Sequence, residues 1–493
     1  MKKRQTDNWV YYISLIVVFI IVGWGILGKE SFEIAANGLF EFLTINFGWS
    51  YLISMFLFVG FATFLAFSKY GKIKLGPDDS EPEFKTSSWF AMLFGAGMGI
   101  GLVFWGVAEP LNHFVAPPFG LQGGTPEAAN FAMKQSFVHW GFHPWANYSI
   151  IGLALAYFQF RKNKPGLISS IFIPLIGEAK VNGPIGKIID IFAVFATVAG
   201  VATSLGLGTL QINGGLNYLF GLPSTTTVQI AIIAIVTFIY IWTAVTGIDK
   251  GIKLLSDINL VTAIVLLGGT ILLGPTVKII NSFTNGLGTY VNQFVYDSFH
   301  IEAFGDNSWI GGWTIFYWAW WIAWAPFVGT FIARISRGRT IKEFVLGVIV
   351  APSMASFIWF AAFGTAGINL GSEIASEAAK VTETALFVVM KQYPLGYVIS
   401  LVAVFLLCTF FITSANSATF VLGMFTSGGD LNPSNSKKIV WGVVQALLAL
   451  ALLIAGGLKT LQIGSVAAAF PFIFIMIFAC ISLLKALKSE DVN

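Results

Sequence analysis

The stretch GAGMGIG, residues 95–101, holds four glycines in seven positions, inside an apolar segment of about 20 residues that is long enough to cross a membrane. Glycine in a helix interior costs roughly 1 kcal/mol relative to alanine, so the run favours local unwinding. Unpaired backbone groups at membrane depth are tolerated only where they are buried in protein or line a cavity. The run therefore predicts a broken helix whose free backbone groups face a binding site.

Composition and charge place the rest of the chain in a membrane as well. Of 493 residues, 56% are hydrophobic and 11% are charged, whereas soluble domains have about 25% charged residues. Apolar runs of about 18 residues or more recur, which predicts a polytopic helical membrane protein. Twelve spans with a cytoplasmic N-terminus put 22 of the 28 lysines and arginines on the cytoplasmic side, the exceptions being Lys29, Lys134, Lys278, Lys380, Lys391 and Lys459. We therefore expect a multi-pass protein of the cell membrane with both termini in the cytoplasm.

A second unusual stretch, WTIFYWAWWIAWAP at residues 313–326, carries five tryptophans and Pro326. It lies five spans after the glycine run. Helix-breaking segments at corresponding positions of two halves are the best sequence pointer to a transporter site. The spacing suggests two five-span repeats, and because five is odd the second repeat must be inverted. The predicted fold class is all-α, with twelve transmembrane helices, a LeuT-type 5+5 inverted repeat in spans 3–12 and two extra N-terminal spans.

This architecture divides the chain into five segments. Residues 276–298 are too polar to span and mildly amphipathic, so they are expected to lie as a helix at the outer interface. The expected segments are an N-terminal tail with spans 1–2 (1–87), the first repeat (88–275), an interfacial helix and outer loop (276–308), the second repeat (309–485) and a short cytoplasmic tail (486–493).

At these stretches the chain resembles the betaine/carnitine/choline transporter family. The resemblance rests on five blocks in the expected order: GAGMGIGLVFWGVAEPL (95–111), HWGFHPWANY (139–148), ATSLGLGTLQI (202–212), WTIFYWAWWIAWAPFVGTFIARISRGRTI (313–341) and FFITSANSAT (410–419). It implies sodium-coupled uptake of a trimethylammonium compound on the LeuT-type core. It also implies a homotrimer embedded in membrane lipids.

The aromatic residues suit such a substrate on chemical grounds. A trimethylammonium group has no N–H donors, but aromatic faces attract it by roughly 0.5–2 kcal/mol per contact. Trp320 and Trp324 are spaced i, i+4, and Trp321 and Trp324 are spaced i, i+3, so all three crowd one side of a helix. Trp145 and Tyr148 share a helix face just after Pro144, which can bend the chain there. The alternative interpretation is an interfacial belt or core packing.

The family resemblance assigns these residues to a substrate site. The residues that it implies in substrate binding are Trp140, Trp145, Tyr148, Trp320, Trp321, Trp324, Met98, Gly99 and Gly101.

The glycine run contains no acidic residue, and this bears on substrate choice. Glu109, beside Pro110, is interpreted as a helix-end or gating residue. Without a carboxylate beside the aromatic residues, a bare cation such as choline lacks a partner, whereas a zwitterion could place its own carboxylate on backbone N–H groups. Choline-preferring relatives tend to carry an acidic residue at the position of Gly101. Glycine betaine is the expected substrate, with carnitine or another betaine second; the alternatives are a sodium-independent carnitine/betaine exchanger and a choline/carnitine uptake transporter.

Because a zwitterion moves no net charge, a coupling ion is expected. A co-transported Na⁺ adds about 2.3 kcal/mol per 100 mV. The resemblance implies one Na⁺ site formed by Gly95, Ala96, Met98, Phe410, Thr413 and Ser414. For the two hydroxyls, a hydrogen bond to the carbonyl four residues earlier is the alternative, slightly favoured from the residues alone.

A second Na⁺ site of the family is matched only in part. Thr197 and Phe327 fit it, but Val201 stands where a hydroxyl residue is expected. Thr203 and Ser204 are possible substitutes.

Other function classes find less support. An enzyme would need a nucleophile with a base or a metal set, and the four histidines look too scattered to provide one. His139 and His143 are interpreted mainly as interface anchors. An ion channel would not require dense tryptophans. No cofactor other than the coupling ion and no nucleic-acid partner is expected.

Overall fold

The computed structural model describes residues 8–97, 99–246 and 249–490. Within them the chain is helical apart from its connecting segments, and an isolated antiparallel bridge joins Lys74 to Thr340. The elements are α1 (Trp9–Leu27), α2 (Lys29–Phe67), η1 (Lys69–Lys72), α3 (Thr86–Gly97), α4 (Ile100–Val115), α5 (Pro126–Trp140), α6 (Phe142–Ala156), η2 (Tyr157–Arg161), η3 (Ile168–Phe172), α7 (Ile173–Val181), α8 (Pro184–Phe220), α9 (Thr226–Thr246), α10 (Asp249–Leu273), α11 (Thr276–Phe299), α12 (Ser308–Ile310), η4 (Gly311–Ile315), α13 (Phe316–Arg334), α14 (Ile341–Ile368), α15 (Ser372–Lys380), η5 (Thr382–Thr384), α16 (Ala385–Met390), α17 (Gly396–Phe425) and α18 (Asn435–Leu487).

Among the described residues, nine helices are long and apolar enough to cross a membrane. The expectation of a polytopic helical membrane protein is therefore confirmed. α18, with 53 residues, is longer than one crossing needs, and it is interrupted where Gly457 takes a φ of 63°. A left-handed φ is readily adopted by glycine, which explains why the interruption falls there.

The glycine run breaks its helix, as the sequence predicts. α3 ends at Gly97 and α4 begins at Ile100, with Gly99 in a non-helical conformation (φ −132°, ψ −149°). Met98 lies outside the described residues. The last carbonyls of α3 and the amides of Ile100 and Gly101 have no partner within their own helices. The Leu102 amide, in contrast, donates to the Gly99 carbonyl at 3.2 Å.

A second break separates α5 from α6, at Gly141 rather than at Pro144 as the sequence suggested. Gly141 has φ −94° and ψ −129°. A Cβ on it would lie 2.6 Å from the carbonyl oxygen of Phe137, so a side chain does not fit. Pro144 sits in the first turn of α6, where the missing N–H costs no hydrogen bond.

The tryptophan-rich helix is not broken at Pro326, which corrects the expectation of a helix break there. α13 runs without interruption from Phe316 to Arg334, preceded by the π-helical turn η4. Surrounding protein buries almost all of α13, and within membranes such packing is what makes proline tolerable in a helix.

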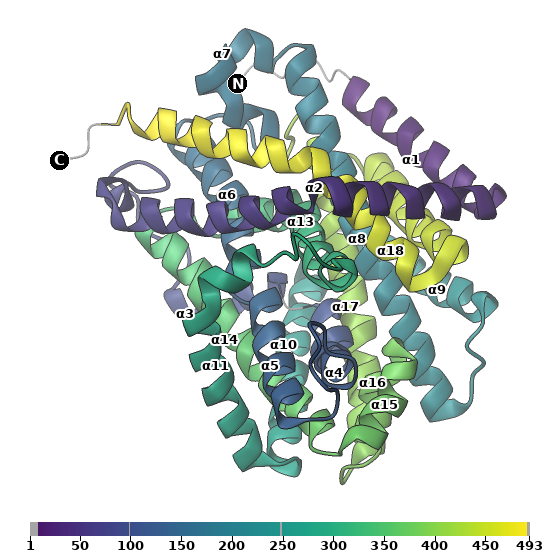
Figure 1. Ribbon diagram of the computed structural model, residues 1–493. Helices are drawn as coiled ribbons and strands as arrows, with labels where there is room; N and C mark the ends of the chain where they lie inside the picture. The colour runs from purple at the N-terminus through teal and green to yellow at the C-terminus, as the bar shows by residue number, and fades with distance from the viewer. Residues whose placement is uncertain (1–7, 98, 247–248, 491–493) are drawn as a thin grey trace.

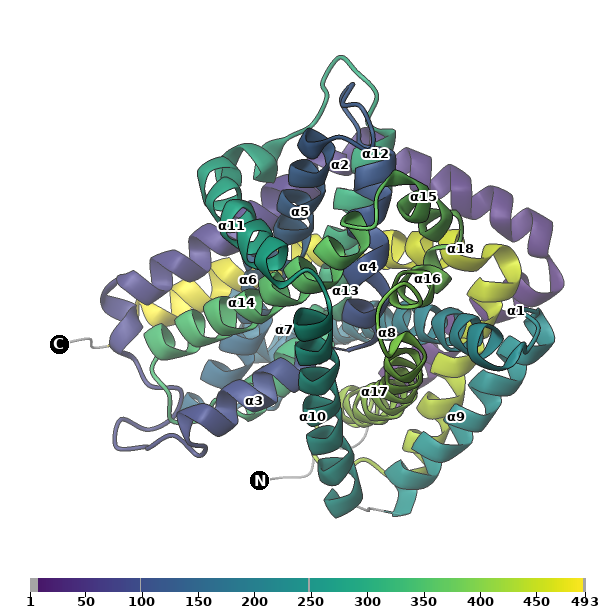
Figure 2. The ribbon, with the colours of Figure 1, turned by 90° about the horizontal axis from the view of Figure 1, so that it is seen from below.

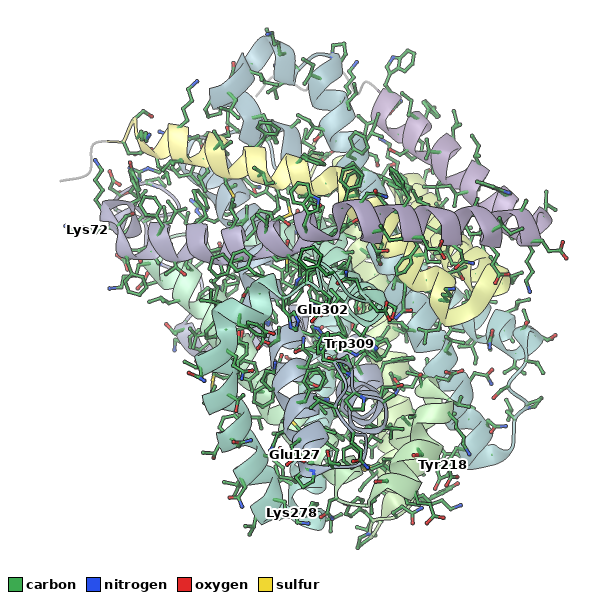
Figure 3. All side chains as sticks on the ribbon, in the orientation of Figure 1. Lys72, Glu127, Tyr218, Lys278, Glu302 and Trp309 are labelled. Atoms are coloured by element: carbon green, nitrogen blue, oxygen red, sulfur yellow. The ribbon has the colours of Figure 1, made fainter. Side chains whose placement is uncertain are left out.

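α13 occupies the middle of the molecule in two perpendicular views (Figures 1 and 2). It packs against α6, α8 and α18. α2 and part of α18 lie side by side across one face of the molecule (Figure 1). Lys72 lies at the left edge of the view in Figure 3, well apart from Glu127 and Lys278 in its lower part.

Candidate functional site

Three of the four tryptophans of α13, namely Trp320, Trp321 and Trp324, are buried on the side that meets α6 and α8. The rings of Trp320 and Trp321 stack, with centroids 4.7 Å apart and planes 15° apart. Trp324 meets Trp320 edge-on at 6.2 Å. The helical spacing thus produces one continuous aromatic surface.

The break at Gly141 brings the aromatic residues of α5 and α6 onto that surface. The Trp140 ring, at the end of α5, lies 4.8 Å from Trp321 and nearly perpendicular to it. On α6, Tyr148 lies 6.3 Å from Trp321 and 5.6 Å from Trp145. All are at least 95% buried. The structure therefore brings together the six aromatic residues singled out in the sequence; we call them the aromatic cluster: Trp140, Trp145, Tyr148, Trp320, Trp321 and Trp324.

Hydrogen bonds fix the orientation of these rings. The Trp321 indole N–H donates to the carbonyl of His139 at 3.0 Å, and the Trp324 indole N–H donates to the carbonyl of Gly200 at 2.8 Å. Asn147, which the sequence analysis did not identify, donates its amide N–H to the Trp321 carbonyl at 2.8 Å. The cluster is thus preorganised by the backbone of α5 and α8.

Gly101 joins the broken helix to the aromatic cluster. A Cβ at this position would lie 2.8 Å from Cη2 of Trp320 and 2.9 Å from Cη2 of Trp140. Only glycine allows the N-terminal turn of α4 to approach the two rings so closely. At Gly99 a Cβ would lie 3.7 Å from the Ser414 hydroxyl, so α17 borders the same break.

Glu109 is not at a helix end, contrary to the expectation from the sequence. It lies within α4 and is fully buried. Its Oε2 accepts hydrogen bonds from the Trp140 indole N–H at 2.8 Å and from the Tyr317 hydroxyl at 2.6 Å. A carboxylate therefore does lie beside the aromatic cluster, at the edge of Trp140.

The histidines around Glu109 also differ from expectation. His139 and His143 are fully buried and so are not interface anchors. Nδ1 of His139 lies 2.6 Å from Oε1 of Glu109, and Nε2 of His113 lies 3.5 Å from the same oxygen. The three residues are not scattered, because their ligating atoms all lie within 4.8 Å of one another. The i, i+4 spacing of Glu109 and His113 was the available sequence signal.

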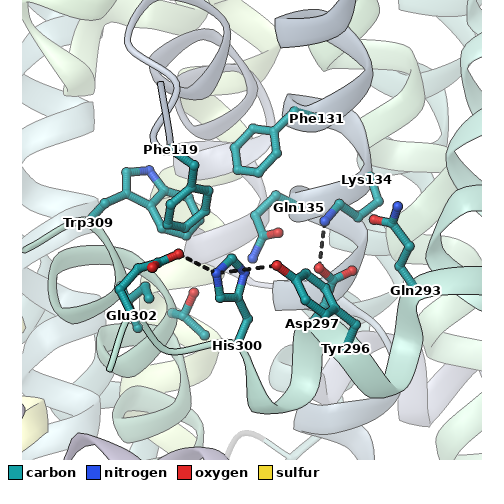
Figure 4. Close-up of a pocket in the computed structure, with 12 residues that line it drawn as sticks. Phe119, Phe131, Lys134, Gln135, Gln293, Tyr296, Asp297, His300, Glu302 and Trp309 are labelled. Atoms are coloured by element: carbon teal, nitrogen blue, oxygen red, sulfur yellow. Dashed lines mark hydrogen bonds and ion pairs between the residues drawn. The ribbon is translucent and has the colours of Figure 1, made fainter. Parts of the chain in front are cut away.

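A pocket of about 230 Å³ adjoins this buried group (Figure 4). Two ion pairs line it, Lys134–Asp297 at 2.6 Å and His300–Glu302 at 2.9 Å. The full lining is Phe119, Phe131, Lys134, Gln135, Gln293, Tyr296, Asp297, His300, Glu302, Trp309, Ile310 and Thr314.

Thr413, one of the proposed sodium ligands in α17, hydrogen-bonds to its own helix, as the alternative interpretation expects. The Thr413 hydroxyl approaches the carbonyls of Thr409 at 3.1 Å and Phe410 at 3.2 Å. It also accepts a hydrogen bond from the Asn259 side chain of α10 at 3.1 Å. The bond to the carbonyl four residues earlier is confirmed for Thr413.

The residues considered for the second Na⁺ site also have partners within the protein. The Thr197 hydroxyl donates to the Ala193 carbonyl at 2.7 Å, and the Phe327 ring contacts Trp324 edge-on at 5.6 Å. Thr203 lies 2.8 Å from the Ser465 hydroxyl and donates to the Leu461 carbonyl at 2.9 Å, both in α18. The Ser204 hydroxyl donates to the Gly200 carbonyl at 3.3 Å.

Comparisons with known proteins identify the family of the chain. The model of the betaine/carnitine/choline family transporters matches residues 9–492. The glycine betaine transporter OpuD of Bacillus subtilis (strain 168) is 51% identical over 98% of this chain and 94% of its own. A probable glycine betaine transporter of Desulfitobacterium hafniense (strain Y51) is 48% identical over 99% of both chains. An ectoine/hydroxyectoine transporter of Virgibacillus pantothenticus is 46% identical over 100% of this chain and 98% of its own. A match over almost the whole chain establishes that this protein is a membrane transporter of the betaine/carnitine/choline family.

Proposed function

We propose that this transporter imports a trimethylammonium zwitterion, glycine betaine first, by Na⁺ symport with alternating access. The observation that carries the proposal is the buried, hydrogen-bonded aromatic cluster around Trp140 and Trp321. Desolvated aromatic faces are a recurring means of recognising a quaternary ammonium group. The names of the relatives at about half identity support glycine betaine within that class.

The break in the glycine run supports a zwitterion rather than a cation. The N-terminus of α4, which begins at Ile100, presents unpaired amides and the positive end of a helix dipole, both of which favour a carboxylate. The indole N–H of Trp320 is buried and makes no hydrogen bond within the described residues, so it is a further donor that a substrate could use. The Glu109 carboxylate weakens the argument against choline, because it supplies negative charge near Trp140 that a cation could use. Choline therefore belongs in the binding test.

The C-terminus of α3 supports a sodium site. Its last carbonyls, including those of Gly95 and Ala96, lie at the negative end of a helix dipole and lack partners within the helix. Ser414 lies across the break from them, near Gly99. Na⁺ at this position would sit beside the substrate carboxylate and favour its binding. The Thr413 oxygen would contribute by exchanging its bond from Asn259 for the ion.

The proposed architecture has twelve spans and a LeuT-type inverted repeat. Dividing α18 at its break, and counting α3 with α4 and α5 with α6 as one broken span each, would raise the nine long helices to twelve. The charge distribution supports cytoplasmic termini in the cell membrane. α11 would lie at the outer interface. Homotrimer formation is proposed on the family resemblance.

Equilibrium binding to the purified protein tests the substrate and the ion together. Tryptophan fluorescence should report saturable binding of glycine betaine in Na⁺ because the ligand would contact indole rings. Carnitine, choline and ectoine are the competitors, and ectoine is included because of the third relative. Tighter binding of ectoine or choline than of glycine betaine would overturn the substrate assignment.

Replacing external Na⁺ by K⁺ is expected to abolish glycine betaine uptake. Without a co-transported charge, the membrane potential cannot concentrate a zwitterion, and the loss amounts to about 2.3 kcal/mol per 100 mV for each ion. Uptake by cells or proteoliposomes with a fixed potential measures the effect. Undiminished uptake in K⁺ would identify an exchanger instead.

Gly101→Asp is expected to raise choline uptake relative to glycine betaine uptake. An acidic side chain here would stand beside the aromatic rings, but its Cβ must first displace Trp320 and Trp140. Gly101→Ala is the matched control, since it adds the same Cβ without the charge. We expect both variants to lose glycine betaine affinity about tenfold or more, for a shift of about 1.4 kcal/mol, and only the aspartate to bind choline better. Equal choline affinity in the two variants would contradict this account of selectivity.

A further inference from the structure

Glu109, His113 and His139 form a buried group, and substrate binding alone does not explain why the two histidines are there. Glu109 uses its two carboxylate oxygens for different partners. Oε2 accepts from Trp140 and Tyr317, on the side of the aromatic cluster. Oε1 faces the two histidines. One carboxylate thus connects the aromatic cluster to a pair of imidazoles.

His113 has no hydrogen-bonding partner within the described residues. Neither ring nitrogen makes a hydrogen bond, although the side chain is fully buried. Leaving a buried polar group unpaired costs about 1–3 kcal/mol, so such a group calls for a ligand or another explanation. Its Nε2 is directed at Oε1 of Glu109 but stays 3.5 Å away, too far for a hydrogen bond.

We propose that Glu109, His113 and His139 form an inhibitory binding site for Zn²⁺ or a similar transition-metal ion. Two imidazole nitrogens and one carboxylate oxygen are a donor set typical of zinc. Two ligands on one tetrahedral zinc ion stand about 3.3 Å apart, given zinc–nitrogen bonds of about 2.1 Å. The 3.5 Å separation of Nε2 of His113 from Oε1 of Glu109 matches this spacing. Nδ1 of His139, now 2.6 Å from Oε1, would need to move outward by about 0.7 Å to reach the same spacing.

The surroundings of His139 suit a metal ligand. Its Nε2 lies 3.0 Å from the Thr314 hydroxyl and 3.1 Å from the Gln135 amide nitrogen. When Nδ1 binds the ion, the ring proton sits on Nε2 and can donate to the Thr314 hydroxyl. Such an outer partner is usual for zinc-bound histidine.

An approach for the ion exists from the pocket. Gln135 and Thr314 line the pocket and also contact Nε2 of His139. Trp309, another lining residue, lies 5.1 Å from the His113 ring. The ion would reach the site from this pocket when these side chains move aside. Zinc would then tie α4 to α5 and hold Glu109, and through it Trp140, in one position. A transporter must rearrange around its substrate, so we expect such a clamp to inhibit uptake.

Zinc binding to the purified full-length protein tests the proposal without any transport measurement. Isothermal titration with Zn²⁺ should show one ion per chain for the wild type, and excess Mg²⁺ should not compete because it prefers oxygen ligands. His113→Ala should weaken binding at least tenfold. His300→Ala is the matched control, because His300 pairs with Glu302 in the pocket and could bind zinc at the surface instead.

The outcomes separate clearly. Weaker binding in His113→Ala with unchanged binding in His300→Ala supports the buried site. The absence of saturable binding in the wild type, equal affinity in His113→Ala, or a loss confined to His300→Ala overturns it. Should His113→Ala prove unfolded by thermal denaturation, Glu109→Gln removes the anionic ligand while keeping the side-chain shape, and unweakened zinc binding in that variant overturns the proposal. Failure here leaves glycine betaine binding untouched, so the two proposals are tested separately.

Discussion

Glycine betaine uptake is expected to fall about 100-fold or more when Trp321 is replaced by alanine. The Trp321 ring contacts Trp140, Trp320 and Tyr148, so it is the shared member of the aromatic cluster. Losing its face removes up to about 2 kcal/mol of cation–π attraction. The cavity and the freed neighbouring rings add to this loss, since truncating a buried tryptophan to alanine typically costs 3–5 kcal/mol of stability. Uptake at subsaturating substrate measures the loss of transport, and fluorescence titration measures the loss of substrate affinity.

The control for this variant is Trp318→Ala in the same helix. Trp318 is also fully buried, but its ring stacks on His143 at 4.7 Å. Both substitutions open a cavity of similar size in α13. If the aromatic cluster binds the substrate, Trp318→Ala should keep the wild-type affinity for glycine betaine at equal expression. Trp321→Phe should retain part of that affinity. Equal losses in Trp318→Ala and Trp321→Ala would show that the tryptophans serve packing alone.

The sequence predicted the parts of the site that depend on local spacing. Trp320, Trp321 and Trp324 meet because residues three and four apart on a helix are neighbours. The glycine run breaks its helix because glycine stabilises a helix poorly. The family-level resemblance placed Trp140 on the cluster. Spacing alone could not, because the break at Gly141 changes the direction of the chain between Trp140 and Tyr148.

Glu109 illustrates what local patterns could not provide. Its neighbour Pro110 suggested a helix end, yet α4 continues through it to Val115. A buried carboxylate is stable only when it is paired, and its partners come from residues 30 to 208 positions away in the chain. Thr413 shows a related limit: the partner from α10, Asn259, occupies an oxygen that the resemblance assigned to sodium.

Glu109→Ala is expected to reduce substrate affinity by about 30-fold or more, whereas Glu109→Gln should keep most of it. Alanine leaves the Trp140 indole, the Tyr317 hydroxyl and the His139 imidazole without an acceptor, at about 1–3 kcal/mol for each. Glutamine can keep its carbonyl toward Trp140 and Tyr317. Its amide can donate to Nδ1 of His139 once that ring carries its proton on Nε2 beside Thr314. Binding of glycine betaine to both purified variants measures the difference.

The same pair of variants decides what the carboxylate contributes to substrate choice. If Glu109 acts by positioning Trp140, glycine betaine binding survives in Glu109→Gln, because a neutral acceptor holds the ring equally well. If its charge attracts the ammonium group directly, Glu109→Gln should weaken glycine betaine and choline binding together and approach the alanine variant. Oε2 meets Trp140 at its N–H edge rather than at the face that would receive the ammonium, and two further donors share the negative charge. The geometry therefore favours positioning, and with it a zwitterion whose ammonium group is held by aromatic faces rather than by a counter-ion.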